Sequence, residues 1–353
     1  MKIHNFSAGP SILPQEVLEK SAQAILNFND SGLSILEISH RSKDFVAVMD
    51  EARATVKRLM KLGDEYEVLF LGGGARLQFL MVPYNLMLGN AGKAAYLDTG
   101  TWAAGAIKEA KNFGQVDVVG SSKESTYNFI PKNYTVGKEY DYFHCTSNNT
   151  IYGTQMHTFP DVDTLMVCDM SSDIFSTVRD YSKFDLIYAG AQKNIGPAGA
   201  TLVVIKKEIL GKTGRNLPSY MNYTEHIAAE SMFNTPPVFA VYATLLTLQY
   251  LEANGGIEGA EARNYEKARI LYEEIDQNPL YLGHAAVEDR SKMNITFRLT
   301  DESLTEKFDK ATKEAGISGL GGHRSVGGYR ASIYNAMPLE SVQILVNVMK
   351  SFK

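Results

Sequence analysis

The sequence has few cysteines, no long apolar run and no excess of basic residues, and each shortage excludes a class of protein. Two cysteines, Cys145 and Cys168, in 353 residues are too few for a disulfide framework or a zinc cluster. No run of about 18 apolar residues is present, so we expect no membrane-spanning helix. A net charge of −5 argues against nucleic-acid binding, which normally needs a basic face. We therefore expect no metal site, no nucleic-acid partner and no membrane partner.

Length and composition are those of an ordinary globular protein. The length predicts about two domains. With 44% hydrophobic residues, the chain can form a large core without disulfides or metal ions. Met1 to Phe6 contains no long apolar stretch, so we expect no signal peptide and a cytoplasmic protein.

Short apolar runs alternate with helical periodicity over the first 250 residues. Strands are expected at 68–71, 94–97, 116–119, 140–145, 165–168, 186–189 and 201–205. Helices are expected at 45–59, 77–88 and 103–113, with Pro83 bending or interrupting the second. This alternation predicts an α/β fold with a mostly parallel sheet. In such sheets, ligands bind beyond the carboxyl ends of the strands.

The pattern changes after about residue 250. Helices at 238–251 and 258–275, a strand at 295–299, a helix at 303–315, a strand near 332–334 and a helix from 339 are expected. These elements predict a smaller α+β domain, and Asn254-Gly255-Gly256 marks the boundary. We therefore divide the chain into a large domain, 16–254, and a small domain, 255–353.

Two residues at predicted strand ends indicate carbonyl chemistry. Lys193 lies among small residues before a glycine-rich loop, and a desolvated lysine can form a Schiff base with a carbonyl. Asp169 ends an apolar strand 24 residues earlier. On its own, Asp169 would be interpreted as a strand-end cap. Together with Lys193, it suits the role of a buried carboxylate that pairs with a pyridinium nitrogen.

Two further motifs suit a flat, phosphorylated cofactor. Gly72-Gly73-Gly74-Ala75-Arg76 follows a strand and opens a helix, where free backbone N–H groups can hold a phosphate. It lacks the Lys-Ser/Thr ending of a nucleotide P-loop. Trp102, the one tryptophan, follows a strand end and could stack on a flat ring.

Two basic clusters complete the set of candidate residues. His40-Arg41 is one, and His323-Arg324 with Arg330 is the other. Few acidic residues lie nearby, and arginine matches the geometry of carboxylates and phosphates. The two clusters therefore suit a substrate with two anionic ends.

Taken together, these motifs resemble the phosphoserine aminotransferases, a family of class V pyridoxal-phosphate enzymes of fold type I. The resemblance runs over the full length of the chain. The segments that carry the resemblance are Asn5-Phe6-Ser7-Ala8-Gly9-Pro10, Ser39-His40-Arg41, Gly72 to Arg76, Thr146 to Gly153, Gln192-Lys193-Asn194, Asn234-Thr235-Pro236-Pro237, and His323 to Ser332. The family often has arginine directly after the triple glycine, whereas here Ala75 intervenes.

The resemblance implies a role for each candidate in binding pyridoxal 5′-phosphate. Lys193 would be the Schiff-base lysine, Asp169 the pyridinium partner, Trp102 the ring platform and Thr150 a further contact. Contacts with the cofactor phosphate would come from Ala75, Arg76 and Gln192 and, across a homodimer with shared active sites, from Asn234 and Thr235.

The resemblance also implies the substrates. Arg41, beside His40, and Arg330 would bind substrate carboxylates, and His323 and Arg324 would bind phosphate. The implied reaction moves an amino group from L-glutamate to 3-phosphohydroxypyruvate in serine biosynthesis, with a related step in bacterial pyridoxine biosynthesis. It also implies a large cofactor domain with a seven-stranded sheet, and a small domain joined by the N-terminal segment, residues 1–15.

Three alternative functions can each be compared with a feature of the sequence. A cysteine desulfurase needs a nucleophilic cysteine on a mobile loop, and both cysteines lie in predicted strands. An aminotransferase for unphosphorylated oxo acids would have no use for His323-Arg324. A non-enzymatic binding protein of the same fold would be indicated by loss of Lys193 or Asp169, and both are present.

Overall fold

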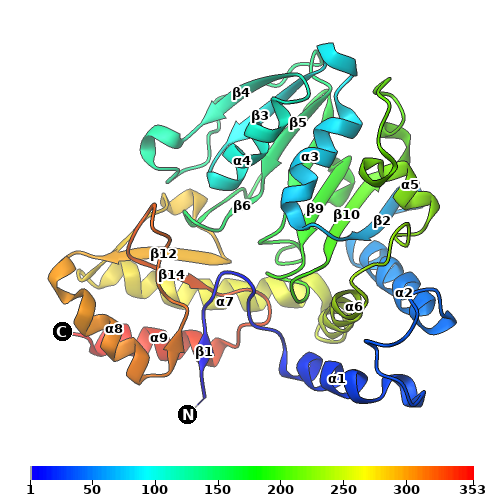
Figure 1. Ribbon diagram of the computed structural model, residues 1–353. Coiled ribbons are helices and arrows are strands. Elements are labelled where there is room, and N and C mark those ends of the chain that lie inside the picture. The colour runs from blue at the N-terminus through cyan, green and yellow to red at the C-terminus, as the bar shows by residue number, and fades with distance from the viewer. Residues whose placement is uncertain (1) are drawn as a thin grey trace.

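A seven-stranded sheet forms the centre of the larger part of the molecule (Figure 1), a computed structural model that describes residues 2–353. The strand order is β2-β10-β9-β8-β5-β3-β4, and only β10 runs antiparallel to its neighbours. The strands are β2 (Tyr66–Leu71), β3 (Lys93–Asp98), β4 (Gln115–Ser121), β5 (Tyr142–Thr146), β8 (Leu165–Asp169), β9 (Leu186–Gly190) and β10 (Thr201–Lys206). The predicted α/β fold and mostly parallel sheet are confirmed.

Most strands of the sheet are largely apolar because helices cover both faces of the sheet. In β2, Val68 and Phe70 pack into one hydrophobic cluster, whereas Leu69 and Leu71 pack into another on the opposite face. The helices around this sheet are α1 (Gln15–Leu26), α2 (Lys43–Met60), α3 (Gly74–Leu86), α4 (Thr101–Ala110), α5 (Tyr223–Ala228) and α6 (Val238–Ala253). Figure 1 shows α3 and α4 over one face of the sheet.

The helix α3 differs from its expected bounds in a way that matters for the site. It begins at Gly74, three residues before the expected start, so Ala75 and Arg76 lie in its first turn. It also continues through Pro83, so the expectation that Pro83 interrupts the helix is wrong. A proline removes its own N–H from the helix, but the buried side chains of Phe79 and Val82 anchor this helix on the sheet.

The C-terminal part forms a second layer with its own core. Its antiparallel sheet has the order β11-β12-β14, and the short β1 pairs in parallel with β13. Its elements are β1 (His4–Asn5), α7 (Gly256–Gln277), β11 (Tyr281–Gly283), β12 (Asn294–Leu299), α8 (Thr305–Glu314), β13 (Ile317–Ser318), β14 (Tyr329–Ser332) and α9 (Leu339–Ser351). Phe6 packs in this core, which places the N-terminal segment against it.

The strand expected near residues 332–334 is displaced. β14 instead ends at Ser332, which pairs with Asn294, the first residue of β12. Beyond that pair the backbone N–H of Ile333 still donates to the carbonyl of Met293 over 2.8 Å, whereas the carbonyls of Ile333 and Tyr334 accept hydrogen bonds from the side chain of Lys267.

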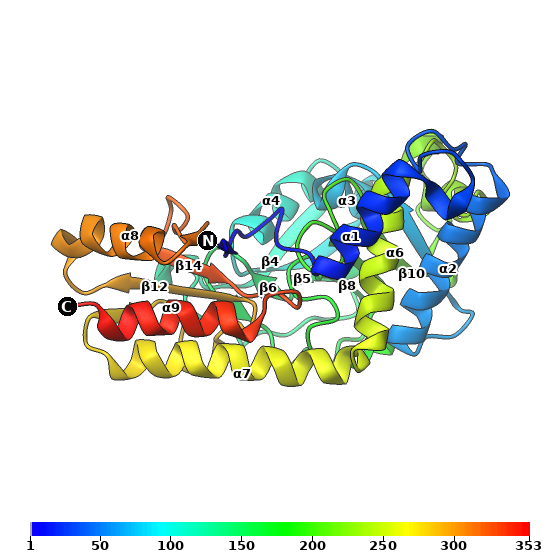
Figure 2. The same cartoon turned by 90° about the horizontal axis from the view of Figure 1, so that it is seen from below.

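The long helix α7 belongs to both parts, as Figure 2 shows by its course beneath them. Ile257 and Ala260 pack in the core of the large sheet, whereas Leu271 and Ile275 pack in the C-terminal core. The division at residues 254–255 therefore stays a prediction. In residues 2–353, no helix is long and apolar enough to cross a membrane.

The C-terminal core predicts a large loss of stability when its central aromatic residue is truncated. Phe308 is fully buried and makes edge contacts with Tyr329 and Phe352. Phe308→Ala should lower the free energy of unfolding by about 3–5 kcal/mol through lost contacts and a cavity. Urea denaturation followed by circular dichroism measures this. The exposed Val287, changed to alanine, is the control, and equal stabilities of the two variants would contradict the prediction.

Candidate active site

The carboxyl ends of β2, β3, β8 and β9 meet at one edge of the sheet, where a cavity of about 240 Å³ opens. The connections that follow these strands bring together most of the residues predicted to hold the cofactor. The cavity is lined by Gly73, Gly74, Ala75, Arg76, Phe79, Trp102, Asp169, Ser171, Gln192 and Lys193. The parallel direction of the strands, read from the sequence, is what places these distant segments side by side.

Lys193 lies in the turn between β9 and β10 with its side chain partly buried. Its Nζ donates a hydrogen bond to Oγ1 of Thr150 over 3.1 Å and lies 5.6 Å from the centre of the Trp102 ring. Thr150 follows β6 (Asn148–Asn149), in the turn that leads to β7 (Thr154–Gln155). Burial lowers the pKa of Lys193, and the positive charge of Arg330 lowers it further. A lysine with a lowered pKa has more of its amine in the nucleophilic, unprotonated form.

The N-terminal segment supports the backbone of Lys193. The backbone N–H of Ser11 donates to the Gln192 carbonyl over 2.9 Å, and the Ser11 hydroxyl donates to the carbonyl of Lys193. Gly9, at φ +149°, passes so close that a Cβ there would lie 3.3 Å from Cγ of Lys193. The small residues of this segment are therefore required by the close approach of the two chains.

Asp169, the last residue of β8, presents a buried carboxylate to the cavity. Its exposed fraction is 4%, and it accepts a hydrogen bond from the backbone N–H of Ser171 over 2.9 Å. Burial raises the pKa of Asp169, whereas the positive charge of Lys193 lowers it. A buried carboxylate without a direct ion pair is costly, and a protonated ring nitrogen is a group that would satisfy it.

The glycine turn after β2 and the first turn of α3 form a place for an anion. Gly73 adopts φ +85°, and a Cβ there would lie 2.5 Å from Cδ2 of Leu77. The first turn of α3 contains no acidic residue. Its backbone N–H groups and the positive end of the helix dipole are therefore free to bind a phosphate. The Arg76 guanidinium lies 5.5 Å from the Trp102 ring centre.

Trp102 itself stands in the first turn of α4. Its indole Nε1 is buried, and no hydrogen-bond partner for it exists within residues 2–353. A buried, unpaired donor beside a cavity is uncommon, and it fits a site that a polar ligand completes.

Arg330, on β14, lies near enough to Lys193 for its charge to act on the amine. Its Nε is buried, and nothing in the described part of the chain bonds to it. Burial lowers the pKa of Arg330. The pKa of His323 is lowered by burial and by the charges of Arg330 and Arg324, which places the three basic groups together. Such a cluster is suited to an anion supplied from solution.

Four predicted site residues lie elsewhere in the chain. His40 and Arg41 precede α2, and Asn234 and Thr235 precede α6. None of the four lines the cavity, and Arg41, Asn234 and Thr235 are exposed. Their predicted roles stay predictions.

The sequence analysis did not identify two of the residues that line the cavity, Phe79 and Ser171. Phe79 lies one helical turn after Ala75, so the 3.6-residue period starting from the glycine turn could have found it. Ser171 lies two residues after Asp169, the spacing at which a backbone N–H closes a turn onto an aspartate side chain.

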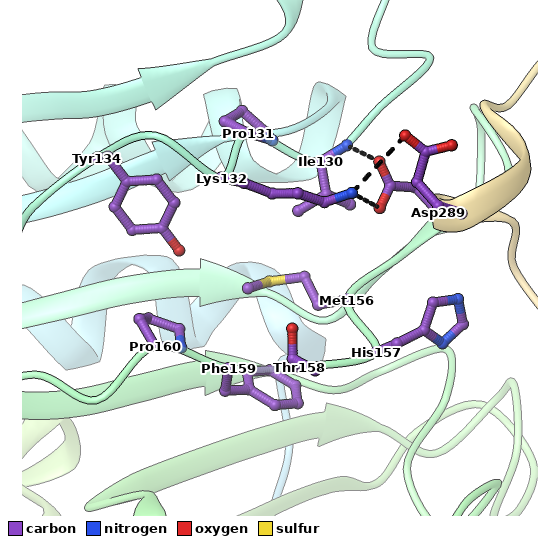
Figure 3. Close-up of a pocket in the computed structure, with 11 residues that line it drawn as sticks. Ile130, Pro131, Lys132, Tyr134, Met156, His157, Thr158, Phe159, Pro160 and Asp289 are labelled. Carbon is purple, nitrogen blue, oxygen red and sulfur yellow. Dashed lines mark hydrogen bonds and ion pairs between the residues drawn. The ribbon is translucent and has the colours of Figure 1, made fainter.

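A larger cavity of about 340 Å³ lies away from these groups, between residues 130–134, 156–160 and 288–289. Figure 3 shows that its charged groups satisfy one another. The Asp289 carboxylate accepts from the backbone N–H of Ile130 over 2.9 Å and pairs with Lys132 over 3.1 Å. Because its charges are paired and its histidine, His157, bonds the carbonyl of Arg290, this cavity is a poorer candidate for chemistry than the cavity at Lys193.

The cavity at Lys193 fits pyridoxal phosphate in each of its parts. The amine suits the aldehyde, the buried Asp169 suits a protonated ring nitrogen, Trp102 suits a flat ring, and the first turn of α3 suits a phosphate. No cluster of metal-ligating side chains occurs among the described residues.

Comparisons with known proteins agree with this geometry. The sequence model of the family described as Aminotransferase class-V matches residues 3–345. A phosphoserine aminotransferase of Flavobacterium psychrophilum is 69% identical, over 100% of this chain and 99% of its own.

Solved structures extend the likeness to three dimensions. The phosphoserine aminotransferase of Bacillus circulans subsp. alkalophilus is similar with a TM-score of 0.96 and 43% identity, covering 99% of this chain and 98% of its own. The pyridoxal-phosphate-bound phosphoserine aminotransferase of Trichomonas vaginalis is similar with a TM-score of 0.93 and 35% identity, covering 99% and 100%. The chain therefore belongs to the class V aminotransferases and uses pyridoxal phosphate as its cofactor.

Proposed function

We infer that the chain transfers an amino group between L-glutamate and 3-phosphohydroxypyruvate, giving O-phospho-L-serine and 2-oxoglutarate. The observation that carries this inference is the group of basic side chains, Arg330, His323 and Arg324, near the amine of Lys193, with the buried Nε of Arg330 unpaired among the described residues. Glutamate and the phosphorylated oxo acid each have an anion at both ends, and one His/Arg cluster can bind the second anion of either. The relatives named phosphoserine aminotransferase support the same reaction.

In this proposal, the position of each residue at the cavity sets its role in the reaction. When bound, pyridoxal phosphate supplies an aldehyde that accepts the amino group and a ring that withdraws electrons from the substrate carbon. The Asp169 carboxylate holds the proton on the ring nitrogen, and the amine of Lys193 takes and returns the proton at the α-carbon of the substrate. Arg330 binds the α-carboxylate, whereas His323 and Arg324 bind the phosphate or the γ-carboxylate.

The rival with a cysteine nucleophile conflicts with the structure. Cys145 and Cys168 are both fully buried on paired strands β5 and β8, with their sulfur atoms 3.6 Å apart. Burial raises the pKa of Cys168 well above its ordinary value. A thiol in that position is protected from a substrate and disfavoured as a thiolate.

The proposal includes a homodimer, a cytoplasmic location and, at the same site, the phosphorylated hydroxy-oxo acid of pyridoxine biosynthesis. The homodimer is supported by Asn234 and Thr235, which are exposed and do not line the cavity of their own chain. Exposed apolar residues on and after α1 offer a surface for a second copy: Leu18, Ile25, Leu26, Leu33 and Leu36.

Lys193→Ala should abolish covalent attachment of the cofactor and nearly all turnover, because no other amine is placed at the cavity. Borohydride reduction of the holoenzyme followed by peptide mapping identifies the labelled lysine. Lys183→Ala, which removes an exposed lysine paired with Asp161, is the control and should keep the label at Lys193. A label on any other lysine in the unaltered enzyme would contradict the assignment.

Substrate choice tests the role of the His323-Arg324 pair. Arg324→Ala should lower kcat/KM for 3-phosphohydroxypyruvate by roughly 10- to 200-fold, the value of one charge-assisted hydrogen bond of about 1.5–3 kcal/mol. The loss for glutamate should be smaller, because a phosphate has more charge and more acceptor oxygens than a carboxylate.

Arg330→Ala is the matched comparison and should affect both substrates alike, because both have an α-carboxylate. The measurement is steady-state kinetics of each half-reaction, with unphosphorylated oxo acids alongside. Equal losses on the two substrates for Arg324→Ala, or a preference of the unaltered enzyme for an unphosphorylated oxo acid, would overturn the proposal.

The shared active site predicts that two inactive variants complement each other. Thr235→Glu places a carboxylate where the partner's cofactor phosphate is expected, and Lys193→Ala removes the lysine of its own site. Mixed dimers contain one intact site, so random reassortment should restore about a quarter of wild-type activity. Activity assays after mixing and analytical ultracentrifugation measure this. A fully active monomer, or no recovery in proven mixed dimers, would show that the sites are not shared.

A further inference from the structure

A buried lysine outside the cavity anchors the segment that follows β14. The side chain of Lys267, on α7, is 1% exposed, and its Nζ donates to the carbonyls of Ile333 over 2.8 Å and Tyr334 over 2.6 Å. No carboxylate of the described chain pairs with it, and burial lowers the pKa of Lys267 to about 7. A buried ammonium without a carboxylate costs stability, and here its donors are spent on two backbone carbonyls.

The anchored segment leads in one direction to the substrate-binding arginine. Arg330 lies on β14, three residues before Ile333, and the sheet ladder ends at Ser332. The hydroxyl of Tyr334 donates to the carbonyl of Ala8 over 2.7 Å, in the N-terminal segment that passes Lys193. The two carbonyls held by Lys267 thus lie directly after β14, the strand that presents Arg330.

In the other direction the segment leads to the cofactor lysine. The backbone N–H of Asn335 donates to Oδ1 of Asn194 over 2.9 Å, and Asn194 directly follows Lys193. The side chain of Asn194 in turn donates to the carbonyl of Ile174. One hydrogen bond therefore joins residues 333–335 directly to the loop that carries Lys193, and a second fixes the side chain of Asn194 that accepts it.

A second anchor from α7 holds the same segment. The Nδ2 of Asn264, one turn before Lys267, donates to Oδ1 of Asn335 over 2.7 Å and to the Ser176 carbonyl over 2.9 Å. The side chain of Asn335 donates to the carbonyl of Phe175, whose φ of +58° is unusual for an aromatic residue. These bonds hold a strained backbone close behind Asp169.

We propose that Lys267 is a positioning residue for the reaction: its bonds to the carbonyls of Ile333 and Tyr334 set the spacing between Arg330 and Lys193. The proposal rests on the proposed function, because that function assigns the α-carboxylate to Arg330 and the cofactor to Lys193. Both substrates have an α-carboxylate, so the effect of Lys267 falls on both alike and not on phosphate recognition.

Lys267→Met tests this, because methionine keeps an unbranched, apolar side chain but removes all donors. We expect KM for glutamate and for 3-phosphohydroxypyruvate to rise by on the order of 10-fold each, with a smaller change in kcat. Lys310→Met, the same change at an exposed lysine of α8, is the control and should leave both constants unchanged. Lys267→Arg retains donors and should recover most of the loss.

A spectroscopic titration separates positioning from mere stability. The charge of Arg330 lowers the pKa at Nζ of Lys193, so a displaced Arg330 should raise the pH midpoint of the absorbance of the bound cofactor in Lys267→Met. If Lys267→Met does not fold, Asn264→Ala removes the second anchor and should produce the same two shifts. A lower melting temperature with unchanged KM values and an unchanged midpoint would overturn the proposal.

The titration also distinguishes failure of this inference from failure of the proposed function. If the unaltered enzyme proved inactive with glutamate and 3-phosphohydroxypyruvate, the proposed function would be wrong, yet the shift in midpoint would still report the distance between Arg330 and Lys193. An active enzyme without the shift would refute the role of Lys267 alone.

Discussion

A carboxylate and an amine, Asp169 and Lys193, are held at one edge of the central sheet with part of their hydration removed. Burial raises the pKa of the first and lowers the pKa of the second, while each charge opposes the effect on the other. Most other features of the site keep this pair apart, partly dry and open to a ligand. Apolar strands beneath it supply the low dielectric, and Gly9 and Gly73 allow backbones to approach without side chains between them.

The C-terminal part completes the site by adding charge. Arg330 enters from β14, a strand of a different sheet, and helix α7 joins the two cores. Because this arginine also lowers the pKa of Lys193, the charge at Arg330 and the state of the amine are coupled. An anion that neutralises Arg330 would remove part of that effect, so the distance between the two parts of the molecule matters for the chemistry.

Several candidate residues named from the sequence line one cavity because they follow buried strands. Lys193, Asp169 and Trp102 stand where apolar runs end, and parallel strands bring their carboxyl ends to one edge. Prediction failed where the outcome depended on packing. The end of β14 at Ser332 follows from its pairing with Asn294 and from the donor on Lys267, and the course of α3 through Pro83 follows from its buried neighbours.

Local pattern by itself determined the order of strands and helices, the seven apolar runs of the central sheet and the chemical types gathered at its edge. Those properties depend on periodicity and on residue type, which a linear chain displays directly. Only the tertiary structure decided that Arg330 lies beside Lys193 and that Asn264, Lys267 and Asn335 connect the two. Their partners are up to 160 residues apart in the sequence, and buried polar groups choose partners by proximity in space, which no local pattern encodes.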